Sequence, residues 1–153
     1  MVQFAHITPT AYLDLFATGR PFHLTLAHLV EQDEAYATWY ASRDTSRSIM
    51  PFINVMDNSA FEMYKQGRPM YETDKLIPMA EKIHADYVVM SDYPGEPAEK
   101  TIEKAYEMSK ELRDAGFGTF FVPQSKEQDL DDLISAFAWA AEAPEVDYIG
   151  VSI

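Results

Sequence analysis

The sequence has 153 residues, 47% of them hydrophobic, and its 12 Lys and Arg face 25 Asp and Glu, which gives a formal net charge of -13. This composition predicts one soluble globular domain over residues 1–153, because a disordered chain would be poorer in apolar and aromatic residues. No apolar run approaches the roughly 20 residues that a membrane-spanning helix needs, so we expect no membrane partner.

The absence of cysteine excludes a disulfide framework, a thiolate nucleophile and a Cys-based zinc site. It favours a cytoplasmic location, where thiols stay reduced. The acidic charge works against non-specific binding of nucleic acids, because negative charge repels phosphate.

Five short apolar runs predict five β-strands. Each run is nearly continuous in hydrophobicity, which is typical of a parallel sheet buried on both faces. The runs are FHLTLAHLV from Phe22, IMPFINVM from Ile49, DYVVM from Asp86, FGTFFV from Phe117 and VDYIGVSI from Val146.

Helical periodicity fills the segments between the apolar runs. Before the first run, Thr8-Pro9 predicts the start of a helix. Later helices are expected over residues 31–42, 73–83, 98–115 and 127–142. The side chains expected to point inward include Tyr12, Leu13, Phe16, Tyr36, Trp39, Tyr40, Leu76, Ile77, Ala80, Ile83, Ile102, Ala105, Tyr106, Leu112, Leu130, Leu133, Ile134, Phe137 and Ala141. Alternating strands and helices predict an α/β fold, either an open doubly wound sheet or a (β/α) barrel, and spacing does not choose between them.

Polar side chains follow three of the predicted strands directly. Asp57 follows the second run, Asp92 the third and Gln124 the fourth, with Phe61 close behind Asp57. The carboxyl ends of parallel strands meet at one edge of a sheet, so we expect these residues to share one mouth. Two acceptor carboxylates, an amide and an aromatic ring suit a flat purine-like base such as guanine. The alternative is structural, because Asp after a strand is often a helix cap or a turn residue.

Three further residues are possible pocket residues. Asn58 and Ser59 belong to the same strand exit as Asp57, and His28 lies near the end of the first run. His28 could reach the mouth, although the sequence favours a hydrogen-bonded core histidine. No metal-ligand spacing, phosphate-binding loop or serine-hydrolase elbow occurs in the chain.

Four segments, in order, resemble the tRNA-guanine transglycosylases. VMDNSAFE from Val55 is similar to their Asp-Ser-Gly-Gly-(Phe/Tyr)-Gln motif, and VVMSDYPGEP from Val88 to their strand-Asp-x-x-x-Pro segment. FFVPQS and the later DYIGVSI resemble their Gln-Gly segment and the glycine-bearing strand after it. The early FHLTLAHLVEQDEAYATWY and the DNSAFE form look closer to the phage branch, which exchanges guanine for 7-deazaguanine derivatives in DNA.

The resemblance implies a partial (β/α)₈ barrel and a base exchange in DNA or tRNA. By this likeness Asp57 is the general acid/base, Phe61 stacks on the base, and Asp92 and Gln124 contact the guanine. Ser59-Ala60 departs from the family's Gly-Gly, and Ser125 replaces a Gly. A phage-encoded protein of this kind would work in the host cytoplasm.

The family's nucleophilic aspartate and zinc site lie beyond the fifth strand, so we expect no zinc or other cofactor in this chain. We expect a truncated or split enzyme, with a second chain or a homo-oligomer completing the barrel. Two alternatives remain. The chain could be an inactive module that binds guanine or deazaguanine, or an unrelated α/β enzyme that uses Asp57 and Asp92 as an acid/base pair on a small metabolite.

Overall fold

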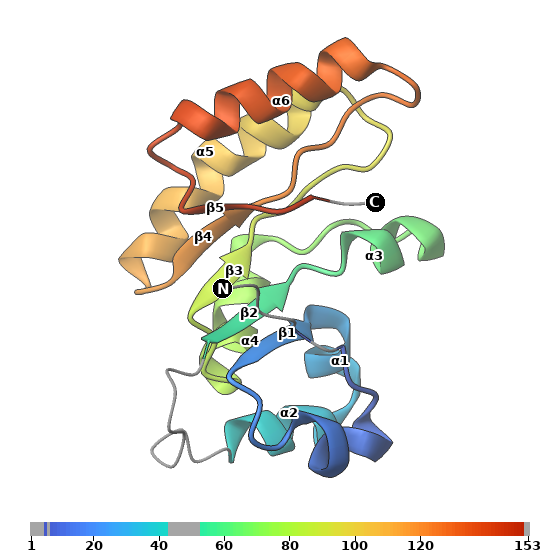
Figure 1. Cartoon of the computed structure of the whole chain (residues 1–153), viewed down its shortest axis with the longest axis vertical. Helices are drawn as coiled ribbons and strands as arrows, with labels where there is room; N and C mark the ends of the chain where they lie inside the picture. Colours follow the sequence, from blue (N-terminus) through green and yellow to red (C-terminus); the bar gives the residue numbers. More distant parts are fainter. Residues whose placement is uncertain (1–4, 6, 43–52, 152–153) are drawn as a thin grey trace.

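A five-stranded, all-parallel sheet organises the protein (Figure 1). The computed structural model describes residues 5, 7–42 and 53–151. The strands lie in the order β1-β2-β3-β4-β5, which is also their order along the chain. They are β1 (Phe22–Leu26), β2 (Ile53–Asp57), β3 (Tyr87–Val89), β4 (Gly118–Phe121) and β5 (Tyr148–Ile149). The α/β prediction is confirmed, and this sequential order is that of a partial barrel, since a doubly wound sheet reverses direction at a switch point.

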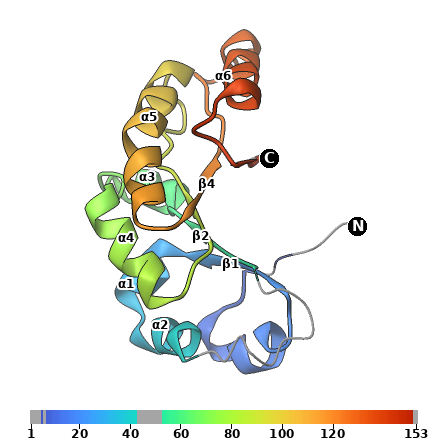
Figure 2. The same ribbon diagram turned by 90° about the vertical axis from the view of Figure 1, so that its left-hand side faces the viewer.

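The helices connect these strands and cover one face of the sheet. Right-handed crossovers that always advance in one direction place successive helices on the same side, and Figure 2 shows α4 and α5 on that side. The turns and helices are η1 (Thr10–Tyr12), η2 (Leu13–Ala17), α1 (Ala27–Gln32), α2 (Glu34–Ala41), α3 (Ala60–Gln66), α4 (Thr73–Lys82), α5 (Ala98–Asp114) and α6 (Leu130–Glu142).

The hydrophobic core lies between the sheet and these helices. Alternate strand residues, among them Met56, Val88 and Phe121, are buried in it against helix residues such as Leu76 and Met108. The intervening strand residues point to the opposite face of the sheet, as the two-residue repeat of a strand requires. That opposite face holds the candidate site described below.

Several sequence predictions about the elements were wrong in part. The first run does not continue as a strand to its end, because α1 begins at Ala27. The expected first helix is a 3-10 turn followed by a π-helical turn, in which Leu13 is buried while Tyr12 and Phe16 are about half exposed. Residues 49–52 of the second run lie outside the described residues.

The last helix also presents a different face from the expected one. Leu130 is 67% exposed and Ile134 is 54% exposed, whereas Ala136 and Ala140 are buried. Small residues let α6 approach α5 closely, where the Trp139 indole donates to the Tyr106 hydroxyl at 2.8 Å. Tyr106 was expected to point inward but is 52% exposed.

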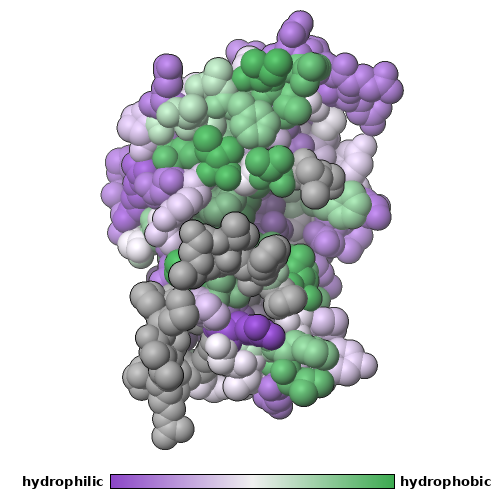
Figure 3. Space-filling model, viewed as in Figure 1, coloured by the Kyte–Doolittle hydropathy of each residue, from purple (hydrophilic) through white to green (hydrophobic). Residues whose placement is uncertain are grey.

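Exposed apolar side chains therefore gather at one edge of the molecule. Figure 3 shows hydrophobic surface over α6 and β5, to which Leu130, Ile134, Tyr148, Ile149 and Val151 contribute. Among the described residues, no helix combines the length and the hydrophobicity needed to cross a membrane.

Candidate functional site

A cavity of about 440 Å³ opens on the face of the sheet opposite the helices, toward the carboxyl ends of the strands. Its polar wall consists of Asp57, Asn58, Asp92 and Gln124, and Phe61 stands beside them. Apolar residues form its floor, namely Phe22, Leu24, Val55, Val89 and Phe120 of the strands and Val122 just after β4. The structure thus brings Asp57, Asp92, Gln124 and Phe61 to one cavity from three strand exits.

Asp92 is almost fully enclosed, at 4% exposed. The Asn58 amide donates to Asp92 Oδ1 at 2.7 Å, and the Gln124 amide donates to Asp92 Oδ2. Burial raises the pKa of Asp92 above its ordinary value, and the two amide donors act in the opposite direction. A carboxylate of this kind is held in place by neutral donors and lies at the edge of the cavity.

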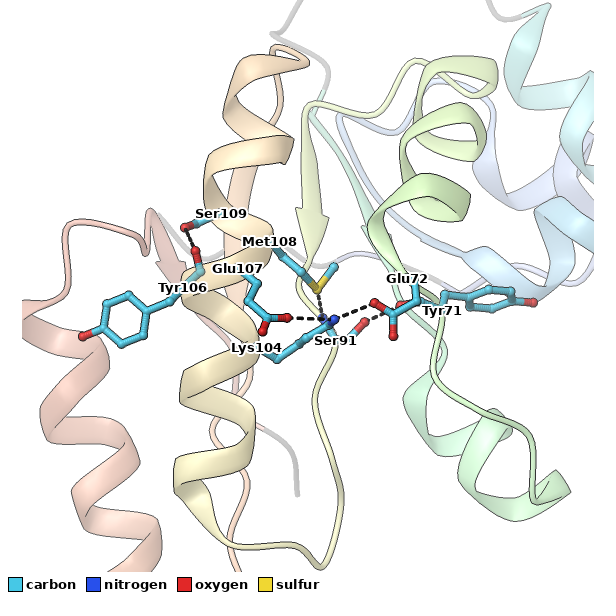
Figure 4. Close-up of polar contacts among 8 residues, drawn as sticks. All are labelled: Tyr71, Glu72, Ser91, Lys104, Tyr106, Glu107, Met108 and Ser109. Carbon is cyan, nitrogen blue, oxygen red and sulfur yellow. Dashed lines mark hydrogen bonds and ion pairs between the residues drawn. The ribbon is translucent and has the colours of Figure 1, made fainter.

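The segment before Asp92 is anchored from both sides (Figure 4). The Ser91 hydroxyl donates to the Tyr71 carbonyl at 2.6 Å, and the Ser91 N–H donates to the Met108 sulfur at 3.3 Å. Near these contacts, Lys104 of α5 forms ion pairs with Glu72 and Glu107. The end of β3 is therefore fixed relative to α4 and α5, which limits the positions open to Asp92.

Asp57 is the last residue of β2 and lines the same cavity. Burial raises its pKa to about 6, and the nearby negative charges of Asp92 and Glu62 contribute in the same direction. The Ser59 N–H, which donates to Asp57 Oδ1 at 2.6 Å, opposes this shift. Asp57 can therefore take up and release a proton close to neutral pH, as a general acid/base must.

Ser59 adopts a left-handed backbone conformation, with φ of 60°. This region favours glycine, and a side chain there costs about 1 kcal/mol. The His28 N–H donates to Ser59 Oγ at 3.1 Å, and His28 Nδ1 lies 2.9 Å from the same oxygen. The two contacts hold Ser59 in a conformation that would otherwise call for the glycine of the resembling family motif.

Two of the three possible pocket residues lie behind the cavity rather than in its wall. Asn58 lines the cavity, whereas His28 and Ser59 are absent from its lining. His28 belongs to α1 and not to the end of the first strand. It is hydrogen-bonded to Ser59, as the sequence favoured, but it is half-buried rather than part of the core. The idea that His28 reaches the mouth is corrected, because α1 turns its imidazole toward Ser59.

Phe61 begins the exposed part of α3, and its side chain is 58% exposed. The Lys65 ammonium lies 4.2 Å from the centre of the Phe61 ring. Phe61 also lines the cavity, so its ring offers an aromatic surface to a flat ligand there.

Sequence reasoning did not find the floor of the cavity. Val89, Phe120 and Val122 had been assigned only to buried strands, and period-2 alternation could have separated the cavity face from the helix face. Gly150 also belongs to the floor. A Cβ at this position would lie 2.7 Å from Phe120 Cε1 and 3.0 Å from Val122 Cγ2, so glycine keeps this part of the floor open.

The loops after β3 and β4 are joined to each other beside the cavity. Gly95 and Lys126 form a parallel backbone bridge. One oxygen of Asp132 on α6 accepts the Ala98 N–H and the Lys126 N–H, each at 3.1 Å. These contacts tie the two loops that carry Asp92 and Gln124.

Within residues 5, 7–42 and 53–151, no group of three or more His, Asp or Glu side chains is arranged to hold a metal ion. The expectation about cofactors is not tested by this finding and stays a prediction.

Comparison with protein-family models finds no match for this chain. Comparison with curated proteins also finds no match. The likeness to the transglycosylase motifs therefore rests on the residues quoted from the sequence.

Proposed function

We propose that the cavity binds a guanine-type base and that the protein acts in a base exchange of the transglycosylase type. The observation that carries this proposal is the Asp92 carboxylate, held by two amide donors at the edge of a cavity that also contains Asp57. The motif resemblance supports the same chemistry.

The polar wall matches the donor pattern of guanine. Guanine presents a ring N–H and an amino group side by side, and a carboxylate offers two acceptor oxygens with about four lone-pair sites. Each Asp92 oxygen accepts one protein donor, so each keeps capacity for a ligand donor. The Gln124 carbonyl oxygen adds a further acceptor.

The remaining surfaces of the cavity suit the faces of a flat ring. Phe61 offers an aromatic face at the mouth, and the aliphatic and aromatic floor receives the opposite face. The cavity volume of about 440 Å³ lies within the range of small-molecule sites.

Asp57 would carry the proton transfer of the exchange. A leaving base needs a proton on its ring nitrogen, and an entering base must lose one. A carboxyl group with a pKa of about 6 can supply both steps near neutral pH.

The exchange also needs a carboxylate that attacks the sugar carbon and forms a covalent intermediate. Among the described residues, Asp57 and Asp92 are the carboxylates that line the cavity, and both have roles at the base. We therefore assign the attack to a carboxylate of a partner chain. A duplex substrate would also need its target base flipped out of the stack.

Calorimetric titration with guanine tests the binding half of the proposal, with adenine as the comparison ligand. We expect guanine to bind and adenine, which lacks the paired donors, to bind at least tenfold more weakly. Asp92→Asn should reduce guanine affinity by about ten- to a hundredfold, because a hydrogen bond to a charged group is lost. Asp74→Asn, on the exposed first turn of α4, removes one charge away from the cavity and should leave the affinity unchanged.

Incubation with labelled guanine and DNA or tRNA tests the exchange half. Incorporation of the label by the wild-type protein, abolished in Asp57→Asn and in Asp92→Asn, would support the proposed exchange activity. Guanine binding without incorporation, alone and with candidate partner chains, would favour the alternative of a base-binding module. No binding of guanine or 7-deazaguanine would overturn the proposal and favour a small-metabolite enzyme.

A further inference from the structure

Asn58 uses every polar atom of its side chain within the protein. It is 3% exposed and follows β2 directly. Its amide nitrogen donates to the Met90 carbonyl and to Asp92 Oδ1, each at 2.7 Å. Its carbonyl oxygen accepts the Ala60 N–H, also at 2.7 Å. The orientation of the amide is therefore fixed, because a flipped amide would lose all three bonds.

These bonds connect two strand exits. Asn58 contacts the chain at Met90 and at Asp92, which lie on either side of the anchored residue Ser91. Gln124 holds the second oxygen of Asp92 from the β4 side, but Gln124 is only half-buried and has capacity left for a ligand. Of the two amides that hold Asp92, the Asn58 amide thus makes all three of its hydrogen bonds within the protein.

We propose that Asn58 is the positioning residue for Asp92: its amide fixes the Asp92 carboxylate in the direction that presents it to the base. The claim that the ligand is a base rests on the proposed function, whereas the hydrogen bond from Asn58 to Asp92 does not depend on it. Asn58 acts through Asp92, and it supplies a donor that favours the ionised form of the buried carboxyl.

The charged surroundings of Asp92 make this donor important. Asp57, from β2, is the neighbouring titratable group in the cavity wall. The charge of Glu62 raises the pKa of Asp57, and His28 lowers it. The side chains bonded to Asp92 itself, Asn58 and Gln124, are neutral. With the Asn58 donor removed, burial and the nearby Asp57 charge would favour the protonated form of Asp92, which cannot accept both guanine donors.

The test compares Asn58→Ala, Asn58→Asp and a matched control, Asn54→Ala. Asn54 lies on β2, is fully buried, and likewise bridges two segments through its amide, donating to the Ile83 carbonyl and accepting from the Thr25 hydroxyl. The wild-type protein and these three variants are titrated by carbon-detected NMR of the Asp92 carboxyl and by guanine calorimetry between pH 5 and 9.

We expect Asn58→Ala to raise the measured pKa of Asp92 and to weaken guanine binding about ten- to a hundredfold at pH 7. The affinity should recover as the pH rises and Asp92 ionises. Asn58→Asp, which keeps the acceptor for Ala60, should show the opposite trend, because two neighbouring carboxyls share one proton at low pH and that proton restores a donor to Asp92. The control should lose thermal stability while its Asp92 pKa and guanine affinity stay unchanged.

An unchanged Asp92 pKa in Asn58→Ala would overturn the inference, and so would an equal change in the control. If the wild-type protein does not bind guanine, the proposed function fails while the NMR titration still decides the role of Asn58. If guanine binds and both Asn58 variants keep wild-type affinity and pH dependence, the positioning role fails alone.

Discussion

Folding disfavours the ionised form of the Asp57 carboxyl, because it buries the group. Its pKa is about 6 when folded, against an ordinary value of 3.8. Below about pH 4 the carboxyl is protonated in both the folded and the unfolded chain, so it has no net effect on stability. Between about pH 4 and 6 the unfolded chain ionises first, and the folded state loses stability as the pH rises.

Replacement of this carboxyl should therefore stabilise the protein. We expect Asp57→Asn to raise the free energy of unfolding at pH 7 by about 2 to 3 kcal/mol, since the amide oxygen can still accept from Ser59 and no charge is buried. Urea unfolding at pH 7 and at pH 3.5 measures the effect. A gain of similar size at both pH values would contradict the assignment, because the burial cost exists only above the unfolded pKa.

At the residue scale, the sequence predicted which side chains meet but not how they are held. Asp57, Asp92 and Gln124 follow strands, and a parallel sheet places strand exits together, so their convergence could be predicted. The bonds from Asn58 to Met90 and from His28 to Ser59 join residues about 30 positions apart, and no local pattern marks them. The left-handed conformation of Ser59 depends on the second of these contacts.

The pairing of β3 with β4 depends on a glycine opposite a tyrosine. Gly118 pairs with Tyr87, and a Cβ on Gly118 would overlap the Tyr87 ring. The ring is also packed edge-to-face against Tyr148 of β5, at 5.0 Å between centroids, so a shift of the ring would disturb this contact. We expect Gly118→Ala to destabilise the protein by about 1 to 3 kcal/mol, the usual effect of overpacking.

A double-mutant cycle separates this clash from other effects of alanine. Tyr87→Ala alone should destabilise the protein, and adding Gly118→Ala to it should cost little more, because the ring is gone. Thermal unfolding of the four proteins gives the coupling energy. Additive effects would show that Gly118 matters for another reason.

At the element scale, long periodic helices were predicted well and ambiguous runs were not. The predicted range 98–115 matches α5 (Ala98–Asp114), with Gly116 in a positive-φ conformation just after its end. FHLTLAHLV was predicted as one strand, but it changes to a helix at Ala27, just after Leu26 pairs with Asp57 at the end of β2. In α6 the large apolar residues were expected inward, yet the close approach of α5 and α6 buries Ala136 and Ala140 instead.

The molecule as a whole combines strong negative charge with an exposed apolar edge. The net charge of -13 opposes contact between copies. The apolar side chains of α6 and β5, together with the outer edge of the two-residue strand β5, favour it. We expect the degree of association between copies to rise with salt concentration, because added ions screen the repulsion and leave the apolar attraction in place.

Sedimentation velocity at 0.02 M and 0.5 M salt measures this balance. We expect a larger associated fraction at the higher salt concentration, and a reduced one in Ile134→Glu, which places a charge on the exposed face of α6. As a control, Lys75→Gln on α4 makes the net charge more negative by the same one unit as Ile134→Glu but lies away from this edge. Association that is stronger at low salt would show that charge attraction, not apolar contact, joins the copies.

The hydrogen bonds to Asp132 affect how the two loops beside the cavity can move. One carboxylate oxygen receives N–H groups from the start of α5 and from the loop after β4, and the Gly95–Lys126 bridge joins the same two segments. The two walls beside Asp92 and Gln124 are therefore mechanically linked, so a displacement of one carries the other with it. A ring that enters beside Asp92 and Gln124 meets two loops that are bonded to each other rather than two separate ones.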